Sequence, residues 1–182
     1  KLRIRRDLGA HEIIDQAISI NRLLPSDTRI TNVVFMGMGE PLANLNEVSE
    51  ALRRMTGLMK ISKRRITVST SGVVPGILKL YDNAPHVNLA LSLNATTDAV
   101  RDRLMPINRK YPLRPLLDAC RKFPLEPSRR ITFEYVMLKD INDKPEDAER
   151  LVRLLKGIPS KVNLIPFNPY EGSGYKRPDD AS

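Results

Sequence analysis

The apolar residues of this chain fall into two alternating patterns. Short continuous apolar runs predict strands over residues 32–36, 65–70, 87–93, 131–138 and 162–165. Stretches with apolar residues at helical spacing predict helices over residues 10–24, 46–59, 75–81, 97–104, 113–123 and 145–156. Regular alternation of strands and helices is typical of a parallel sheet covered by helices. Because only five strands are predicted, we expect a partial barrel or an open sheet, and not a closed eight-stranded barrel.

The run from Val33 to Leu42 (VVFMGMGEPL) is the most informative of these segments. Its four leading apolar residues predict a strand that is covered on both faces. Gly37 and Gly39 then permit backbone conformations that other residues resist, and Glu40 adds a carboxylate. This pattern favours a ligand-binding loop at the end of a strand, although an ordinary strand-to-helix turn with a solvated glutamate is the simpler alternative.

Polar residues also follow the other predicted strands. They are Ser69, Thr70 and Ser71 at the end of the second strand, Ser92, Asn94, Thr96 and Thr97 at the third, and Asn168 after the fifth. The carboxyl ends of parallel strands form one rim, where ligands bind in such folds. Hydroxyls, amides and a carboxylate on that rim would suit the amine, carboxylate and ribose of a nucleoside–amino acid ligand. Each residue alone could equally cap a helix or stabilise a turn.

The charge of the chain points to a polyanionic partner. The formal net charge is +9, and the basic residues cluster within residues 1–6, 60–65, 101–110, 129–130 and 176–177. Nucleic acid is therefore the favoured partner. Solvated helix ends and loops are the alternative for each cluster.

Cysteine and histidine are scarce. A single cysteine excludes an internal disulfide and indicates a reducing, cytoplasmic setting. Cys120 lies on the apolar face of its predicted helix, so we expect a buried, unreactive thiol. The sequence contains no phosphate-binding glycine motif, no metal-ligand cluster, no signal-peptide pattern and no apolar run long enough to span a membrane.

Five long segments resemble the RlmN family of radical SAM RNA methyltransferases. They are NVVFMGMGEPLANLNEV (32–48), KRRITVSTSGVVP (63–75), LALSLNATTDAVRDRLMPINRKYPL (89–113), RITFEYVMLKDIND (130–143) and KVNLIPFNPY (161–170). They follow the family's order and spacing over nearly the whole chain. The resemblance implies a partial (βα)6 barrel of the radical SAM type.

The resemblance also implies which residues contact S-adenosyl-L-methionine. These are Gly39 and Glu40 of GMGEP, Ser69 of STSG, the segment Ser92, Leu93 and Asn94, and Asn168 of IPFN. Many family members carry His at the position of Asn94. The implied contacts coincide with the rim residues that the strand pattern selects.

The chain departs from the family in its cysteines. The family binds a 4Fe-4S cluster through a CxxxCxxC loop, which would lie just upstream of Lys1, and uses two further catalytic cysteines that this chain does not match. We therefore expect residues 1–182 to form an incomplete radical SAM core, truncated at both ends, with no metal ligand and no catalytic residue of its own. Such a piece should not methylate RNA alone. It should also expose an apolar sheet edge, which favours aggregation and low stability.

The activity implied by the resemblance is methylation of C2 of adenine in 23S rRNA and in tRNA, through a methylated cysteine. Flavodoxin-like electron donation and a monomeric, cytoplasmic enzyme without membrane attachment are implied with it. Two alternatives remain: the sibling activity that methylates C8 of adenine, and a non-catalytic RNA-binding relic of the fold.

Overall fold

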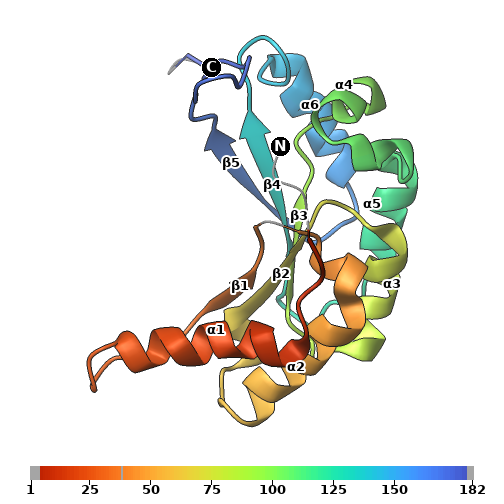
Figure 1. Cartoon of the computed structure of the whole chain (residues 1–182). Helices are drawn as coiled ribbons and strands as arrows, with labels where there is room; N and C mark the ends of the chain where they lie inside the picture. Colours follow the sequence, from red (N-terminus) through yellow and green to blue (C-terminus); the bar gives the residue numbers. More distant parts are fainter. Residues whose placement is uncertain (1–4, 38, 180–182) are drawn as a thin grey trace. The chain divides into compact units, whose positions relative to one another are not determined.

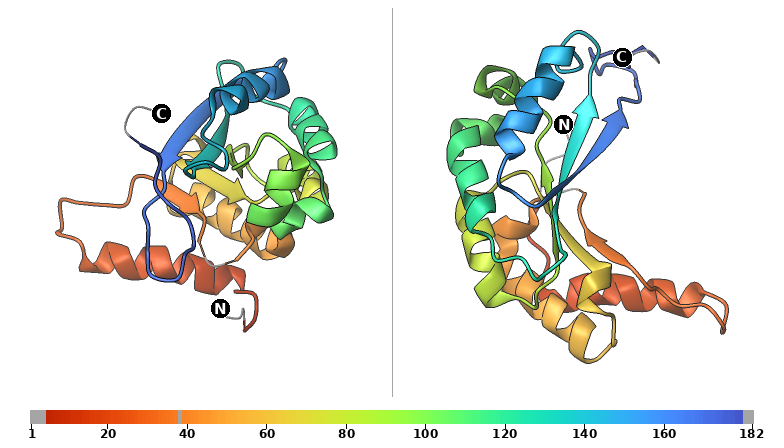
Figure 2. Two further views of the ribbon diagram at one scale, coloured as in Figure 1. Left: turned by 90° about the horizontal axis from the view of Figure 1, so that it is seen from above. Right: turned by 180° about the vertical axis from the view of Figure 1, so that it is seen from behind.

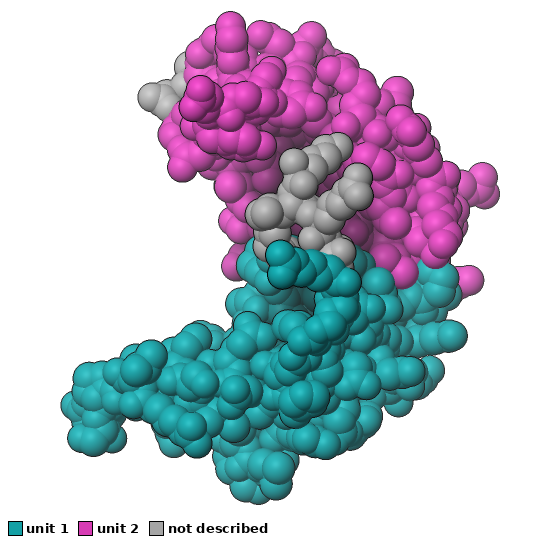
Figure 3. Space-filling view, viewed as in Figure 1, with its two compact units in different colours: residues 1–70, 75–89 teal, residues 71–74, 90–182 magenta. Residues whose placement is uncertain are grey.

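The computed structural model describes residues 5–37 and 39–179. The chain divides into two compact units, which Figure 3 shows in different colours. Unit 1 comprises residues 1–70 and 75–89, and unit 2 comprises residues 71–74 and 90–182. Each unit is described by itself.

The described residues of unit 1 contain two parallel strands, two complete α-helices and all but the first residue of a third (Figure 1). Strand β1 (Val33–Phe35) pairs with β2 (Ile66–Thr70), with Val33 opposite Ile66. The helices are α1 (Ala10–Leu23), α2 (Leu45–Gly57) and α3 (Val74–Asn83), and two short 3-10 helices are η1 (Pro41–Asn44) and η2 (Lys63–Arg65). The core is apolar, and Leu52, Met55 and Ile66 are among its fully buried residues.

The described residues of unit 2 contain two further strands and the last three residues of a third, and all of these are parallel. They are β3 (Asn88–Ser92), β4 (Ile131–Met137) and β5 (Ser160–Pro166). The helices are α4 (Asp98–Leu104), α5 (Leu113–Lys122) and α6 (Pro145–Leu155), with the 3-10 helix η3 (Pro106–Arg109). Both views in Figure 2 place α4, α5 and α6 on the same side of these strands. The alternating order and the parallel strands confirm the predicted α/β class.

The prediction that β1 is covered on both faces is wrong. Val34 is 51% exposed, and Met36, just beyond the strand, is 67% exposed. The physical reason is that the outward-facing side chains of β1 line a hollow in unit 1, with α1 on its other side. The continuous apolar run therefore reflects a half-covered strand.

Among the described residues, no helix has the length and apolar character needed to cross a bilayer.

The segment after β1 is held close to α3 by a glycine. A Cβ atom on Gly76, in the first turns of α3, would lie 2.5 Å from Cβ of Leu42 and 3.1 Å from its carbonyl oxygen. Leu42 belongs to η1 and is itself buried. The glycine therefore permits the packing that fixes the loop between β1 and α2.

We expect Gly76→Ala to destabilise the protein by about 1–3 kcal/mol, because the added methyl group overpacks the contact with Leu42. Alanine is the better helix former, so helix propensity alone predicts the opposite sign. Gly57→Ala is the matched control, since a Cβ at this helical glycine meets nothing within 4 Å. Urea unfolding monitored by circular dichroism measures both, and equal stability of the two variants would contradict the packing argument.

Candidate functional site

The loop after β1 presents bare backbone. Gly37 has φ of +119° and Gly39 has φ of +142°, values that favour glycine over residues with a Cβ. Apart from the adjoining residues of the chain, no described atom lies within 4 Å of the position that a Cβ would occupy on either residue. The predicted backbone accessibility of this loop is therefore present, and Met38 between the glycines lies outside the described residues.

Glu40 ties this loop to the end of the neighbouring strand. Its Oε1 accepts hydrogen bonds from the backbone N–H of Leu42 at 3.0 Å and from the hydroxyl of Thr70 at 2.8 Å. The first bond caps η1, and the second joins the ends of β1 and β2. The carboxylate therefore fixes the loop in addition to any contact that it makes with a ligand.

A hollow of about 700 Å³ opens beside the loop in unit 1. Val34 and Met36 of the β1 segment, Ile20 of α1, and the loop residues Gly39 and Glu40 line it. The lining is mostly apolar but also includes Arg6 and the two carboxylates Asp7 and Glu40. Apolar walls with a few polar groups are typical of small-molecule sites.

The two predicted serine ligands have hydroxyl groups available for a ligand. Ser69 in β2 is 7% exposed, and Ser92 at the end of β3 is half-buried. Within the described residues, neither hydroxyl has a hydrogen-bond partner in the protein. Asn168, just after β5, is exposed. These positions therefore have donors and acceptors where the family resemblance implies contacts with S-adenosyl-L-methionine.

The turn that leaves β3 is held by β4. The backbone N–H groups of Leu93 and Asn94 both donate to the carbonyl of Glu134, at 2.9 and 3.4 Å. Asn94 has φ of +57°, the left-handed conformation that Asn tolerates better than most residues. Its Oδ1 accepts from the N–H of Val136 at 2.8 Å, and its Nδ2 donates to Sδ of Met105 at 3.2 Å. The Asn94 side chain thus stabilises its own turn, and its predicted contact with a ligand stays a prediction.

Asn142 completes this turn and was not singled out in the sequence. Its side chain is 1% exposed and its Nδ2 donates to the carbonyls of Asn94 and Val136, both at 2.8 Å. Its Oδ1 accepts from the N–H of Leu138 at 2.7 Å. A lone asparagine in an Asn-Asp loop segment gives no signal in the sequence that distinguishes it from a turn residue.

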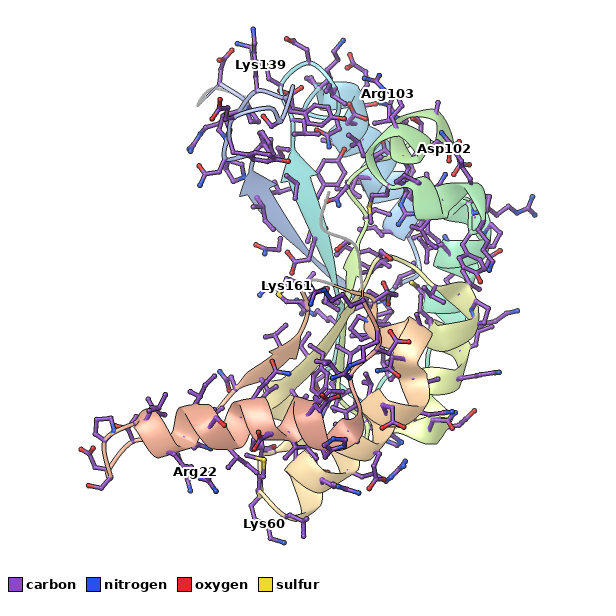
Figure 4. The ribbon with its side chains drawn as sticks, in the orientation of Figure 1. Arg22, Lys60, Asp102, Arg103, Lys139 and Lys161 are labelled. Carbon is purple, nitrogen blue, oxygen red and sulfur yellow. The ribbon has the colours of Figure 1, made fainter. Side chains whose placement is uncertain are left out.

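Arg101 corrects the interpretation of one basic cluster. The sequence grouped it with residues 101–110 as part of a nucleic-acid surface, but its side chain is 0% exposed. Other basic residues labelled in Figure 4 are exposed, namely Arg22, Lys60, Arg103 and Lys161, whereas Lys139 is half-buried. Lys139 is bonded to Asp179 at 2.7 Å, so part of its charge is neutralised within the protein. The positive surface is therefore smaller than the predicted basic clusters suggest.

The residues of this chain do not fit an iron–sulfur cluster. Its one cysteine, Cys120, is buried in α5, and burial raises the pKa of its thiol to about 12. Among the described residues, no group of three or more His, Cys, Asp and Glu side chains is arranged to hold a metal ion. The donors that are present suit an organic ligand with amine, carboxylate and hydroxyl groups.

We expect Cys120 to resist thiol reagents at pH 8 while the protein is folded, because the reactive thiolate is suppressed by burial. The raised pKa stabilises the fold below the ordinary thiol pKa of about 8.5, and that contribution is lost as the pH rises toward 12. Ellman's reagent should detect one thiol only after denaturant is added. Rapid reaction of one equivalent in buffer would contradict this placement.

The family model described as the Radical SAM superfamily matches residues 6–155. Two relatives that carry the name dual-specificity RNA methyltransferase RlmN are similar over almost the entire chain. The protein of Syntrophobacter fumaroxidans is 52% identical over 98% of this chain, and that of Geobacter sulfurreducens is 56% identical over 97%. The chain covers 53% and 48% of these relatives, so it spans about half of their length.

Solved structures are also similar to this chain. A crystal structure of a radical SAM methyltransferase from Sphaerobacter thermophilus matches with a TM-score of 0.91 and 41% identity, covering 98% of this chain and 53% of that one. A domain of pyruvate-formate lyase-activating enzyme from Bacteroides vulgatus matches with a TM-score of 0.59 at 17% identity, which shows a shared fold alone. By the extent of the family match, this chain belongs to the radical SAM superfamily.

Proposed function

We propose that this chain is the S-adenosyl-L-methionine-binding core of an RNA methyltransferase. The observation that carries the proposal is the 52–56% identity to proteins named dual-specificity RNA methyltransferases over 97–98% of the chain. The available hydroxyls of Ser69 and Ser92 and the bare backbone at Gly39 support the same cofactor. Gly39, Glu40 and Ser69 in unit 1, and Ser92, Leu93, Asn94 and Asn168 in unit 2, are the proposed contacts.

The proposed reaction of the full-length enzyme is methylation of C2 of adenine in 23S rRNA and in tRNA. A 4Fe-4S cluster would supply the electron that cleaves S-adenosyl-L-methionine, and its cysteine ligands are not among residues 1–182. The proposal includes a flavodoxin-type electron donor, a monomeric enzyme and a cytoplasmic location. The exposed basic residues Arg22, Lys60 and Lys161 are candidates for contacts with RNA phosphates, which would make RNA affinity fall with rising salt.

The full-length gene product, with its cluster reconstituted, should transfer a labelled methyl group to rRNA and tRNA. Nuclease digestion and mass spectrometry should then yield 2-methyladenosine. 8-Methyladenosine would show the sibling activity instead. Salt-dependent RNA binding without any transferred methyl group would favour the non-catalytic relic.

Ser92→Ala should weaken binding of S-adenosyl-L-methionine to the full-length gene product by about 2–13-fold, which corresponds to one lost hydrogen bond of about 0.5–1.5 kcal/mol. Ser19→Ala, on the exposed side of α1, is the matched control and should leave the dissociation constant unchanged. Isothermal titration calorimetry measures both. Equal affinities for the two variants would remove Ser92 from the proposed contacts.

A further inference from the structure

Arg101 is a buried cation that is bonded almost entirely to backbone carbonyls. Its Nε donates to the carbonyl of Leu93 at 3.0 Å, and its Nη2 donates to the carbonyls of Ser92 at 3.1 Å and Ser71 at 2.7 Å. These carbonyls belong to the end of β3 and to the loop that follows β2. Arg101 therefore joins two exits from the strands of the parallel sheet.

The charge of Arg101 is balanced indirectly. Its Nη1 donates to Oδ1 of Asn108 at 3.0 Å, and Nδ2 of Asn108 donates to Asp98 at 3.0 Å and Asp102 at 2.7 Å. Burial lowers the pKa of the guanidinium to about 10, so it remains charged at neutral pH. Burying a charge without a direct ion pair is costly, and an apolar residue would fill the same volume more cheaply.

The surrounding chain is shaped to admit the guanidinium. Gly72 has φ of +112°, and a Cβ on it would lie 3.3 Å from Nη2 of Arg101 and 3.1 Å from the methyl carbons of Leu116. The glycine of the STSG segment therefore gives the guanidinium room to reach the Ser71 carbonyl. This role for Gly72 is separate from any contact with a ligand.

The bonds of Arg101 determine the conformation of a proposed ligand contact. Arg101 fixes the carbonyls of Ser92 and Leu93, while Glu134 accepts from the N–H groups of Leu93 and Asn94. The backbone of the β3 exit is thus held from two sides, yet the Ser92 hydroxyl has no partner among the described residues. A ligand that binds this hydroxyl meets a group that is already oriented, which reduces the entropy lost on binding.

We infer that Arg101 is a positioning residue for the cofactor: it holds the carboxyl end of β3 so that Ser92 and the adjoining backbone bind S-adenosyl-L-methionine. The inference rests on the proposed function. The planar fork of arginine is required because three carbonyls in different directions accept from two of its nitrogens. Lysine keeps the charge but not this geometry.

The test compares Arg101→Lys with Arg103→Lys in the full-length gene product. Arg103 lies on the same helix, is exposed, and projects from the outside of α4 in Figure 4. We expect Arg101→Lys to weaken S-adenosyl-L-methionine binding at least tenfold by calorimetry, and to accelerate hydrogen exchange at the amides of Leu93 and Asn94. Arg103→Lys should change neither quantity.

A purely structural role predicts a different result. Arg101→Lys would then lower the melting temperature, while the folded protein would bind S-adenosyl-L-methionine with unchanged affinity, and this outcome overturns the inference. If Arg101→Lys does not fold, Asn108→Ala replaces it, because that variant removes the side chain that orients the guanidinium. We then expect about threefold weaker binding, and unchanged binding again overturns the inference.

The same experiment separates this inference from the proposed function. If the unsubstituted protein binds S-adenosyl-L-methionine and Arg101→Lys binds it equally well, only the inference fails. If the unsubstituted protein does not bind S-adenosyl-L-methionine, the proposed function fails and the positioning role is overturned with it.

Discussion

The turn after β3 depends on satisfying backbone groups that are buried where a strand ends. A buried carbonyl or N–H without a partner costs about 1–3 kcal/mol, so each one at this exit needs a donor or an acceptor. Arg101 serves the carbonyls of Ser92 and Leu93, and Asn142 serves those of Asn94 and Val136. These two buried polar side chains allow the chain to leave the sheet in a sharp, fixed turn.

In unit 1, the turn at the end of β1 is fixed by different groups. Glycines at positive φ make the turn, and Glu40 bonds to Leu42 and Thr70. Close packing of Gly76 on Leu42 then fixes the segment that follows. In both units, hydrogen bonds from polar side chains fix the loop that follows a strand. Other groups nearby, either serine hydroxyls or glycine backbone, remain available to a ligand. This division of roles fits the proposed binding of S-adenosyl-L-methionine, because a reacting ligand must be held in one orientation.

Membership of the radical SAM superfamily places these loops in a chemical context, but the chain spans about half of its relatives. Its own residues provide carboxylate, hydroxyl and backbone groups to a ligand. They include a single cysteine, which is too few thiols to bind an iron–sulfur cluster. Residues 1–182 therefore contain the proposed cofactor contacts, whereas the proposed methyl transfer also depends on groups that these residues do not include.

The sequence by itself determined the order of the strands and helices, their parallel class and the burial of Cys120, because apolar spacing records which side of each element faces the core. It also selected Ser69 and Ser92 through their positions at the carboxyl ends of strands. Only the tertiary structure showed that Val34 is exposed, that Arg101 is buried and that Asn142 holds the Asn94 turn. Local spacing could not show these features, because the burial of a side chain and the partners of a polar group depend on residues far away in the chain.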